Sequence, residues 1–292
     1  MYYYRLDLVY DGRAFQGWQT QPHHQTIQDH LNNALKDLDP ALQTLAAGRT
    51  DAGVHALKQV VRLSLATHYP ASAVLATANA HLPPAIRVGQ ALEVAESFHP
   101  LHNAGKEYRY FWAPQIYPWQ AGLITPFDYP CDLGLMQAAA QALEGRHDFA
   151  AFACQGTPVS STVREIYKAQ IEFKKTALAE EMPLGLTGFY QFTIVGSGFL
   201  KQMVRLLMGG IFNVGRGKVS LAQWAQALPA AAALTPSLEE RSLAGGWHGP
   251  RLGPVAPPDG LYLANVFFTA AERDARVRQL ALRNGTSSAS LG

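Results

Sequence analysis

The hydrophobic period changes repeatedly along this chain, and that change limits it to folds that mix strands with helices. Residues 2–10, "YYYRLDLVY", alternate polar and apolar side chains, which is the period of a half-buried strand. The following segment places apolar residues at helical intervals behind Thr26, a residue suited to cap a helix; they are Ile27, Leu31, Leu35 and Leu38. We therefore predict an α+β fold.

Further strand patterns occupy residues 57–65 and 86–94, so the loop that holds Asp51 joins two strands. After "NAGKE" the pattern restarts. It predicts a strand at 108–113, a helix around 135–143, strands near 162–174 and 187–195, a helix from about 199 and a last strand in "LYLANVFF". The stretch between residues 229 and 260 carries Pro and Gly at turn-forming density and predicts a long loop.

This order predicts two similar α+β domains with mixed or antiparallel sheets, flanking helices and an active-site cleft between them. We place the first domain at residues 1–103, with the Asp51 loop, and the second at 104–270. Residues 271–292 form a polar tail that begins as a basic helix and ends in a frayed Gly/Ser segment. The arginines of this tail form either a solvated face or an RNA-contacting arm.

Composition narrows the class of protein. With 48% hydrophobic and 16% charged residues the chain is globular, and a net charge of +2 neither demands nor excludes nucleic acid. The N-terminus has no basic leader and no long apolar run, so we expect no signal peptide, no membrane span and a cytoplasmic protein. Cys131 and Cys154 lack CxxC partners, which indicates reduced core thiols and no metal site.

Nucleotide and hydrolase motifs are incomplete. "GGIFNVGRGKVS" has Arg216 where a phosphate loop needs Lys, and its Gly217-Lys218 pair lacks the other required residues. "GSGFLK" has Lys201 where a dinucleotide fingerprint needs its third glycine. HExxH and GxSxG are absent. We expect no cofactor.

The loop "AAGRTDAGVHA", residues 46–56, sets Asp51 two places after Arg49 and just before Gly53, Val54 and His55. An aspartate in a turn commonly bonds its own backbone, which is the simpler interpretation. His55 is a candidate only because it follows Asp51 in the same loop. The glycines here would let an RNA backbone come near.

Two segments of the first domain and its neighbour combine glycine, aromatic and polar residues. "YDGRAFQGWQTQP" offers Gln16 and Trp18 for hydrogen bonding and stacking with unpaired bases, or else Trp18 packs under the loop. "GKEYRYFW" puts Tyr108 and Tyr110 on one strand face. Either tyrosine belongs to the core or borders the cleft, where it could stack on a base.

Two later segments add cations and an apolar wall. "GFLKQMVRLLMGG" predicts a helix with Lys201 and Arg205 one turn apart on one face, which is a solvated stripe or a phosphate-binding one. Leu261 in "APPDGLYL" could form an apolar wall. Arg216 and Lys218, in "VGRGK", are further candidate phosphate contacts.

These segments together resemble the tRNA pseudouridine synthase A family, from about residue 4 to residue 268. The resemblance is carried by "YDGRAFQGWQTQP", "AAGRTDAGVHA", "NAHLPPAIRV", "SFHP", "KEYRY", "GRHDFAAF", "GFLKQMVR", "VGRGK" and "APPDGLYL", in the family's order. It implies an isomerase with the pseudouridine synthase fold, which acts without cofactor on uridines 38 to 40 of the tRNA anticodon arm. It also implies a homodimer in which one tRNA touches both subunits.

The resemblance further implies roles for five residues. Asp51 would be the catalytic aspartate, Arg49 would replace the extruded base, and Tyr108 would stack on the target uracil. Arg205 would pair with the catalytic carboxylate, and Leu261 would pack against the base. The chain departs from the family in "GWHGPRLGPV", an insertion before Leu261 that carries Trp247, His248 and Arg251.

Two other functions use the same residue types. An RNA-binding protein could hold an unpaired base without turnover, and a base-releasing N-glycosidase also places a carboxylate at an anomeric carbon. The presence of Asp51 together with Arg49 and Arg205 favours the isomerase over simple binding. The route that Asp51 takes stays open at this point: attack at C1′, attack at C6 of the uracil, or stabilisation or deprotonation of the sugar.

Overall fold

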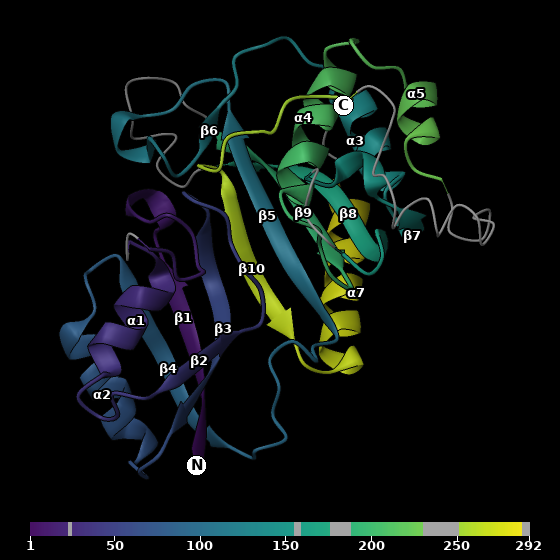
Figure 1. The fold of residues 1–292 in the computed structure, drawn as a ribbon. Helices are drawn as coiled ribbons and strands as arrows, with labels where there is room; N and C mark the ends of the chain where they lie inside the picture. The colour runs from purple at the N-terminus through teal and green to yellow at the C-terminus, as the bar shows by residue number, and fades with distance from the viewer. Residues whose placement is uncertain (23–24, 155–158, 176–187, 230–250, 288–292) are drawn as a thin grey trace. The chain divides into compact units, whose positions relative to one another are not determined.

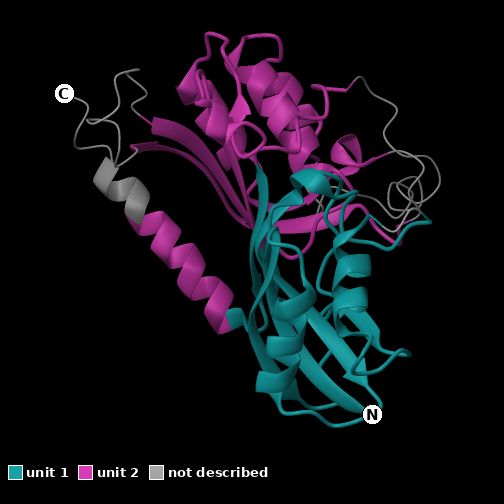
Figure 2. Ribbon diagram, turned by 90° about the vertical axis from the view of Figure 1, so that its left-hand side faces the viewer, with its two compact units in different colours: residues 1–106, 261–270 teal, residues 107–260, 271–292 magenta. Residues whose placement is uncertain are grey.

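A computed structural model describes the chain except for residues 23–24, 155–158, 176–187, 230–250 and 288–292 (Figure 1). It divides into two compact units. Unit 1 comprises residues 1–106 and 261–270, and unit 2 comprises residues 107–260 and 271–292 (Figure 2). The last strand is thus grouped with the N-terminal residues, whereas the domain limits from the sequence group it with 104–270. In the described part of the chain, no helix is long and apolar enough to cross a membrane.

Unit 1 is built on a mixed sheet in the order β4-β1-β3-β10, with β2 also paired to β3. The strands are β1 (Tyr2–Tyr10), β2 (Gln43–Ala46), β3 (His55–Leu65), β4 (Ile86–Val94) and β10 (Leu261–Phe267). β1 is antiparallel to β3 and β4, whereas β10 runs parallel to β3 with Tyr262 opposite His55. The strand predictions at 2–10 and 86–94 are confirmed, and so is the prediction that the Asp51 loop joins two strands.

Helices α1 (Ile27–Leu35) and α2 (Ala71–His81) cover one face of this sheet (Figure 1). The Thr26 hydroxyl accepts a hydrogen bond from the Asp29 N–H at 3.3 Å, so the predicted helix cap is confirmed. Alternate residues of β1 are fully buried; they are Tyr4, Leu6 and Leu8. The Tyr4 hydroxyl bonds the backbone of Tyr69, just before α2, so these side chains lie on the helical side of the sheet. The intervening side chains of β1 therefore point to the opposite face of the sheet.

Unit 2 also combines a sheet with helices. Its strands follow the order β5-β9-β8-β7, from β5 (Gly105–Ala113), β9 (Gly188–Gly196), β8 (Val163–Lys175) and β7 (Gly145–Asp148), and short β6 (Thr125–Pro126) runs parallel to β5. Its helices are α3 (Leu133–Gln141), α4 (Met203–Gly215), α5 (Leu221–Gln226) and α7 (Ala270–Ser287). Three 3₁₀ turns complete the description: η1 (Gly12–Ala14), η2 (Pro118–Gln120) and η3 (Ala150–Phe152). The α+β prediction is confirmed.

The predicted start of α4 is wrong. Gln202 has φ 60°, in the left-handed region, and the helix begins only at Met203. A residue whose backbone is left-handed cannot continue a right-handed helix, so the chain enters α4 through a turn. Lys201 therefore precedes the helix and does not share a helical face with Arg205.

Two further predictions need correction. Cys131 and Cys154 are free thiols, as expected, but both are half-buried and not in the core. The C-terminal segment does begin as a helix, α7, but its arginines are not simply solvated. The guanidinium of Arg273 lies 4.0 Å over the ring of Tyr167, a cation–π contact within unit 2.

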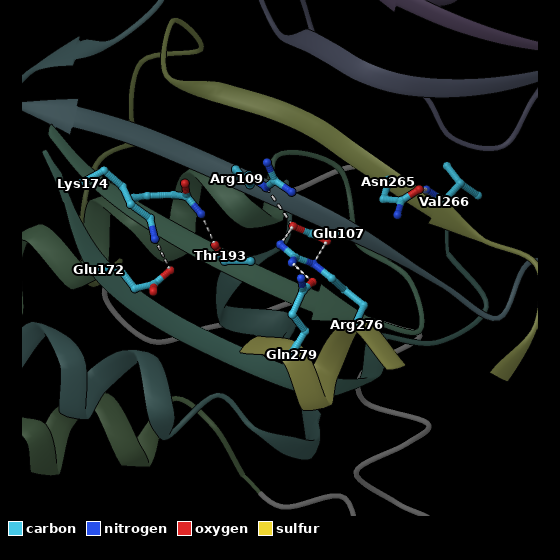
Figure 3. A network of polar contacts seen from close by, with 10 residues as sticks. Glu107, Arg109, Glu172, Lys174, Thr193, Asn265, Val266, Arg276 and Gln279 are labelled. Carbon is cyan, nitrogen blue, oxygen red and sulfur yellow. Dashed lines mark hydrogen bonds and ion pairs between the residues drawn. The ribbon is translucent and has the colours of Figure 1, made fainter. Parts of the chain in front are cut away.

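A buried carboxylate attaches α7 to the sheet of unit 2 (Figure 3). Glu107 on β5 is fully buried and accepts hydrogen bonds from Arg109 Nε and from two nitrogens of Arg276, each at 2.8 Å. Burial acts to raise the pKa of Glu107, but the hydrogen bonds and charges of the two arginines outweigh it and lower the pKa. Loss of both arginines would leave a buried charge uncompensated.

Candidate active site

Asp51 lies in the loop between β2 and β3 and is half-buried. Its carbonyl accepts a hydrogen bond of 3.1 Å from the Val54 N–H, which closes the turn that carries the side chain. Gly53, inside this turn, has φ 79°, a conformation that favours glycine. The "DAGV" sequence therefore encodes a tight turn with the aspartate at its first position.

Backbone hydrogen bonds fix this loop against residues 11–18. The N–H of Trp18 donates to the carbonyl of Thr50 at 3.0 Å, and the N–H of Gly53 donates to the carbonyl of Phe15 at 3.3 Å. The hydroxyls of Thr50 and Tyr10 share a buried hydrogen bond of 2.8 Å. Asp51 is thus held between anchored residues on both sides, and its position is set before any ligand binds.

Two glycines make this close approach possible. A Cβ on Gly12 would lie 2.1 Å from the carbonyl oxygen of Val54, and one on Gly17 would lie 2.6 Å from that of Thr50. Gly17 also has φ +86°. Gly12 and Gly17 therefore leave room for the loop that holds Asp51.

Trp18 is a core residue. Its side chain is 2% exposed and its ring centroid lies 6.5 Å from that of Tyr10. Trp18 therefore packs under the loop, as the second of the two interpretations has it, and its ring is not exposed for stacking on a base. Gln16 is exposed and donates from Nε2 to Gln25 Oε1 at 3.4 Å. Of the two, only Gln16 lies where a ligand can reach its side chain.

His55 holds two loops together and is not a reactive candidate. Its Nδ1 accepts a hydrogen bond from the Gly12 N–H at 3.1 Å and lies 3.3 Å from Asp11 Oδ1, and its ring stacks on Tyr262 at 4.4 Å. Only 1% of the histidine is exposed.

Its neighbour Asp11 has a shifted pKa. Burial acts to raise the pKa of Asp11, but hydrogen bonds from Arg13 outweigh it and lower the pKa.

Arg49 and Leu261 are the other candidates in unit 1. Arg49 is exposed, and the residue before it is fixed because Gln59 Nε2 donates to the Gly48 carbonyl at 2.7 Å. Leu261 opens β10 and is 5% exposed. Sequence reasoning missed Gln59, together with Tyr10 and Thr50. For Tyr10 the sequence holds a usable signal, because this residue begins the glycine-rich segment "YDGRAFQGWQTQP", which contacts the loop.

Tyr108 and Tyr110 on β5 are both buried in unit 2, at 7% and 0% exposure. The Tyr110 hydroxyl bonds Thr125 Oγ1 at 2.8 Å and donates to the Pro257 carbonyl at 3.0 Å, and burial raises the pKa of its phenol. Tyr110 is therefore the core tyrosine of the pair. Tyr108 packs edge-on against Phe199 at 5.0 Å and stays a candidate for stacking.

Arg205 joins α4 to the segment that follows the insertion. Its Nε donates to the Ala256 carbonyl at 2.7 Å, and the Ala256 N–H donates back to the Arg205 carbonyl at 3.1 Å. Further along α4, a Cβ on Gly209 would clash with the Pro254 oxygen, so the end of the insertion lies directly on the helix. Arg251 is exposed, whereas Trp247 and His248 fall outside the described residues.

The remaining cations lie at the two ends of α4. Lys201 precedes the helix, and Lys218 follows it; both are exposed. Arg216 follows the last residue of the helix, and its guanidinium lies 4.0 Å over the ring of Tyr129, an arrangement that orients the charge. All three can meet a phosphate, which keeps their predicted role open.

The candidate residues divide between the two units. Unit 1 contains Gln16, Trp18, Arg49, Asp51 and Leu261, and unit 2 contains Tyr108, Lys201, Arg205, Arg216 and Lys218. The pairing of Asp51 with Arg205 joins residues of different units and stays a prediction. Over the described ranges, no three or more His, Cys, Asp or Glu side chains form a group suited to a metal ion.

Comparison with known proteins identifies the family. A family model described as tRNA pseudouridine synthase matches residues 139–269. Relatives named tRNA pseudouridine synthase A include one from Bordetella petrii, 37% identical over 270 residues that cover 90% of each chain. Those from Chromobacterium violaceum and Exiguobacterium sp. are each 35% identical over 90% of this chain and cover 92% and 97% of their own lengths. The chain belongs to the tRNA pseudouridine synthase A family.

Proposed function

We propose that this protein converts uridine to pseudouridine in tRNA, with Asp51 as its catalytic carboxylate. The observation that carries the proposal is the anchoring of the Asp51 loop. Hydrogen bonds at Thr50 and Gly53 hold the loop on both sides of the carboxylate, in a chain whose relatives are named for this activity. Such anchoring is what a reacting group needs, because a small misplacement is costly in rate.

The reaction needs one carboxylate and a base, and no redox cofactor. The bond from C1′ to N1 breaks, the uracil turns, and C5 bonds to C1′. The proton on C5 then leaves and N1 gains one, so the product is an isomer of the substrate. Asp51 acts at C1′, at C6 or on the sugar, and the three routes make the same demand for an ionised carboxylate.

Arg205 supports that ionisation in our proposal. A site that excludes water protects a reactive sugar from hydrolysis, but burial alone disfavours the charged form of a carboxylate. A guanidinium beside it reverses this preference. Arg205 suits the role because its Nε is fixed by the Ala256 carbonyl, which leaves the planar head in one orientation.

The target uridine must leave the base stack to reach Asp51, at a cost of a few kcal/mol. We propose that exposed Arg49 fills the vacated position, and that Tyr108 and Leu261 contact the uracil. Lys201, Arg216, Lys218 and Gln16 contact the RNA elsewhere, and the cations set its position more than its sequence. The buried Trp18 supports the loop beneath Gln16 and makes no contact with RNA.

The wider proposal covers the substrate region, the assembly and the location. The targets are uridines 38 to 40 of the anticodon arm, and the enzyme is a homodimer whose two subunits share one tRNA. We propose a cytoplasmic location, because the enzyme must meet its tRNA substrate there. No cofactor takes part.

Product analysis separates this function from its two competitors. Unmodified tRNA transcript is incubated with the protein, digested to nucleosides and separated. Pseudouridine without free uracil supports the proposal. Free uracil with abasic RNA would identify an N-glycosidase, and unchanged nucleosides despite tight tRNA binding would identify a binding protein.

A further inference from the structure

Unit 1 contains a cavity of about 540 Å³ on the face of its sheet opposite the helices. Arg5 of β1, three residues of β4, residues in 97–102 and Phe268 line it. Arg5 lies five residues from Tyr10, which bonds the Asp51 loop. At about 3.3 Å per strand residue, that separation is roughly 17 Å. The cavity is therefore distinct from the site around Asp51.

Planar groups form much of the wall. The rings of Phe98 and Phe268 are 5.2 Å apart, and those of His99 and His102 are 4.5 Å apart. The Arg5 guanidinium lies 4.9 Å from the centroid of Phe268. Such walls favour a flat, π-bearing ligand, because stacking on rings and guanidinium planes stabilises it.

The charges of the cavity argue against an anion as the ligand. Arg5 is already bound by Asp7 through hydrogen bonds of 2.7 and 3.0 Å. Its neighbour Arg62 donates to the Phe98 carbonyl at 3.2 Å and lies over the ring of Tyr3. Both cations are therefore engaged within the protein, which reduces their attraction for a phosphate. Arg5 and Glu93 in the wall present both donors and acceptors to a neutral, polar ring.

His99 supplies a directed donor. Its Nδ1 is shielded from solvent and has no hydrogen-bond partner among the residues that the structure describes. A proton on Nδ1 would be buried without an acceptor, so the neutral ring carries its proton on Nε2. Burial and the nearby charges of His102 and Arg62 lower the pKa of His99, which keeps the ring neutral. Nε2–H can then donate to a carbonyl oxygen or ring nitrogen.

We propose that this cavity binds an unpaired nucleobase of the tRNA, separate from the target uridine. The inference rests on the proposed function, since it takes the RNA to be the ligand. The volume lies within the range of small-ligand sites, about 300–1,000 Å³. The cavity thus gives unit 1 a second contact with the substrate, which positions the tRNA and takes no part in the chemistry.

Filling the cavity tests the proposal. Ser97 is exposed and lines the wall, so Ser97→Trp occupies the space without removing a core residue. Asn33→Trp places the same ring on exposed α1, on the helical side of unit 1, as the matched control. We expect Ser97→Trp to raise KM and Kd for tRNA about 10-fold, the loss of one stacked base, while kcat at saturation is retained. An unchanged Kd would overturn the proposal.

A spectroscopic test identifies the ligand chemistry. The imidazole resonances of His99 and His102 are followed in Asp51→Asn protein during titration with nucleoside monophosphates and, separately, with ribose 5-phosphate. Shifts with the nucleotides alone support a base site. Equal shifts with ribose 5-phosphate, or none with any nucleotide, would overturn it.

The remaining outcomes are also decisive. If sedimentation shows that Ser97→Trp, and not Asn33→Trp, changes the oligomeric state, the cavity holds a second copy of the chain and the proposal is wrong. A wild-type protein that forms no pseudouridine refutes the proposed function. An active wild type with an unaffected Ser97→Trp variant refutes only the base site.

Discussion

Replacement of Gly17 by alanine should displace the Asp51 loop while the fold survives. The new Cβ would lie 2.6 Å from the Thr50 oxygen, whereas ordinary contact begins at 3.4 Å. The carbonyl must therefore move by the difference, about 0.8 Å. Thr50 immediately precedes Asp51, and the same shift lengthens the 3.0 Å hydrogen bond from the Trp18 N–H. The reacting carboxylate should move with its neighbour.

The expected magnitudes follow from these displacements. An L-residue at φ +86° costs about 1–2 kcal/mol, and a weakened hydrogen bond adds about 1 kcal/mol of lost stability. A misplacement of about 1 Å can cost about 100-fold in rate, so kcat should fall by about 10- to 100-fold. The loss in kcat should exceed any change in KM.

Gly217→Ala is the matched control for stability. Gly217 also has a positive φ, +71°, but nothing lies within 4 Å of its Cβ position. It should therefore show only the conformational cost. Unfolding in urea gives the stability of both variants, and tritium release from C5-labelled tRNA gives kcat. If Gly17→Ala loses stability yet turns over within twofold of wild type, the loop does not position the catalytic group.

Four further perturbations test other parts of the account. Tyr10→Phe removes the hydroxyl that bonds Thr50 and should cost about 1–2 kcal/mol in urea unfolding, with a lower kcat. The pKa of Glu107 is lowered in the folded state, so its contribution to stability is present above the unfolded pKa of about 4.5 and is lost as pH falls through the folded pKa. In Glu107→Gln the free energy of unfolding should therefore fall less steeply at acid pH than in wild type. An unchanged acid dependence would contradict this. Arg205→Ala should lower kcat, and unchanged turnover would remove Arg205 from the mechanism. Lys218→Ala should reduce the slope of log Kd for tRNA against log salt by about 1, and an unaltered slope would remove this phosphate contact.

The elements whose signal is local were predictable from the sequence. The strand at 2–10 and the helix behind Thr26 each follow from side-chain period and a cap, which act within a few residues. The start of α4 was not predictable from the sequence, because nothing in the local pattern marks Gln202 as left-handed. The local pattern therefore predicts Lys201 on the helix, whereas the helix begins only after it.

The contacts of the candidate site depend on residues far apart in the chain. Gly17 meets Thr50, and Trp18 is buried, only because two segments about thirty residues apart lie side by side. Residue types in "YDGRAFQGWQTQP" are compatible with both RNA binding and loop packing, so pattern alone left Trp18 undecided. Tertiary contacts decided it in favour of packing.

The most direct test of the central claim is tritium release from tRNA labelled at uridine C5, with wild type compared with Asp51→Asn. We expect release by wild type, with pseudouridine in the anticodon arm, and no release by Asp51→Asn even though that variant binds tRNA as tightly. Equal release by both proteins would contradict the role of Asp51, and no release by wild type from any tRNA would contradict the proposed function.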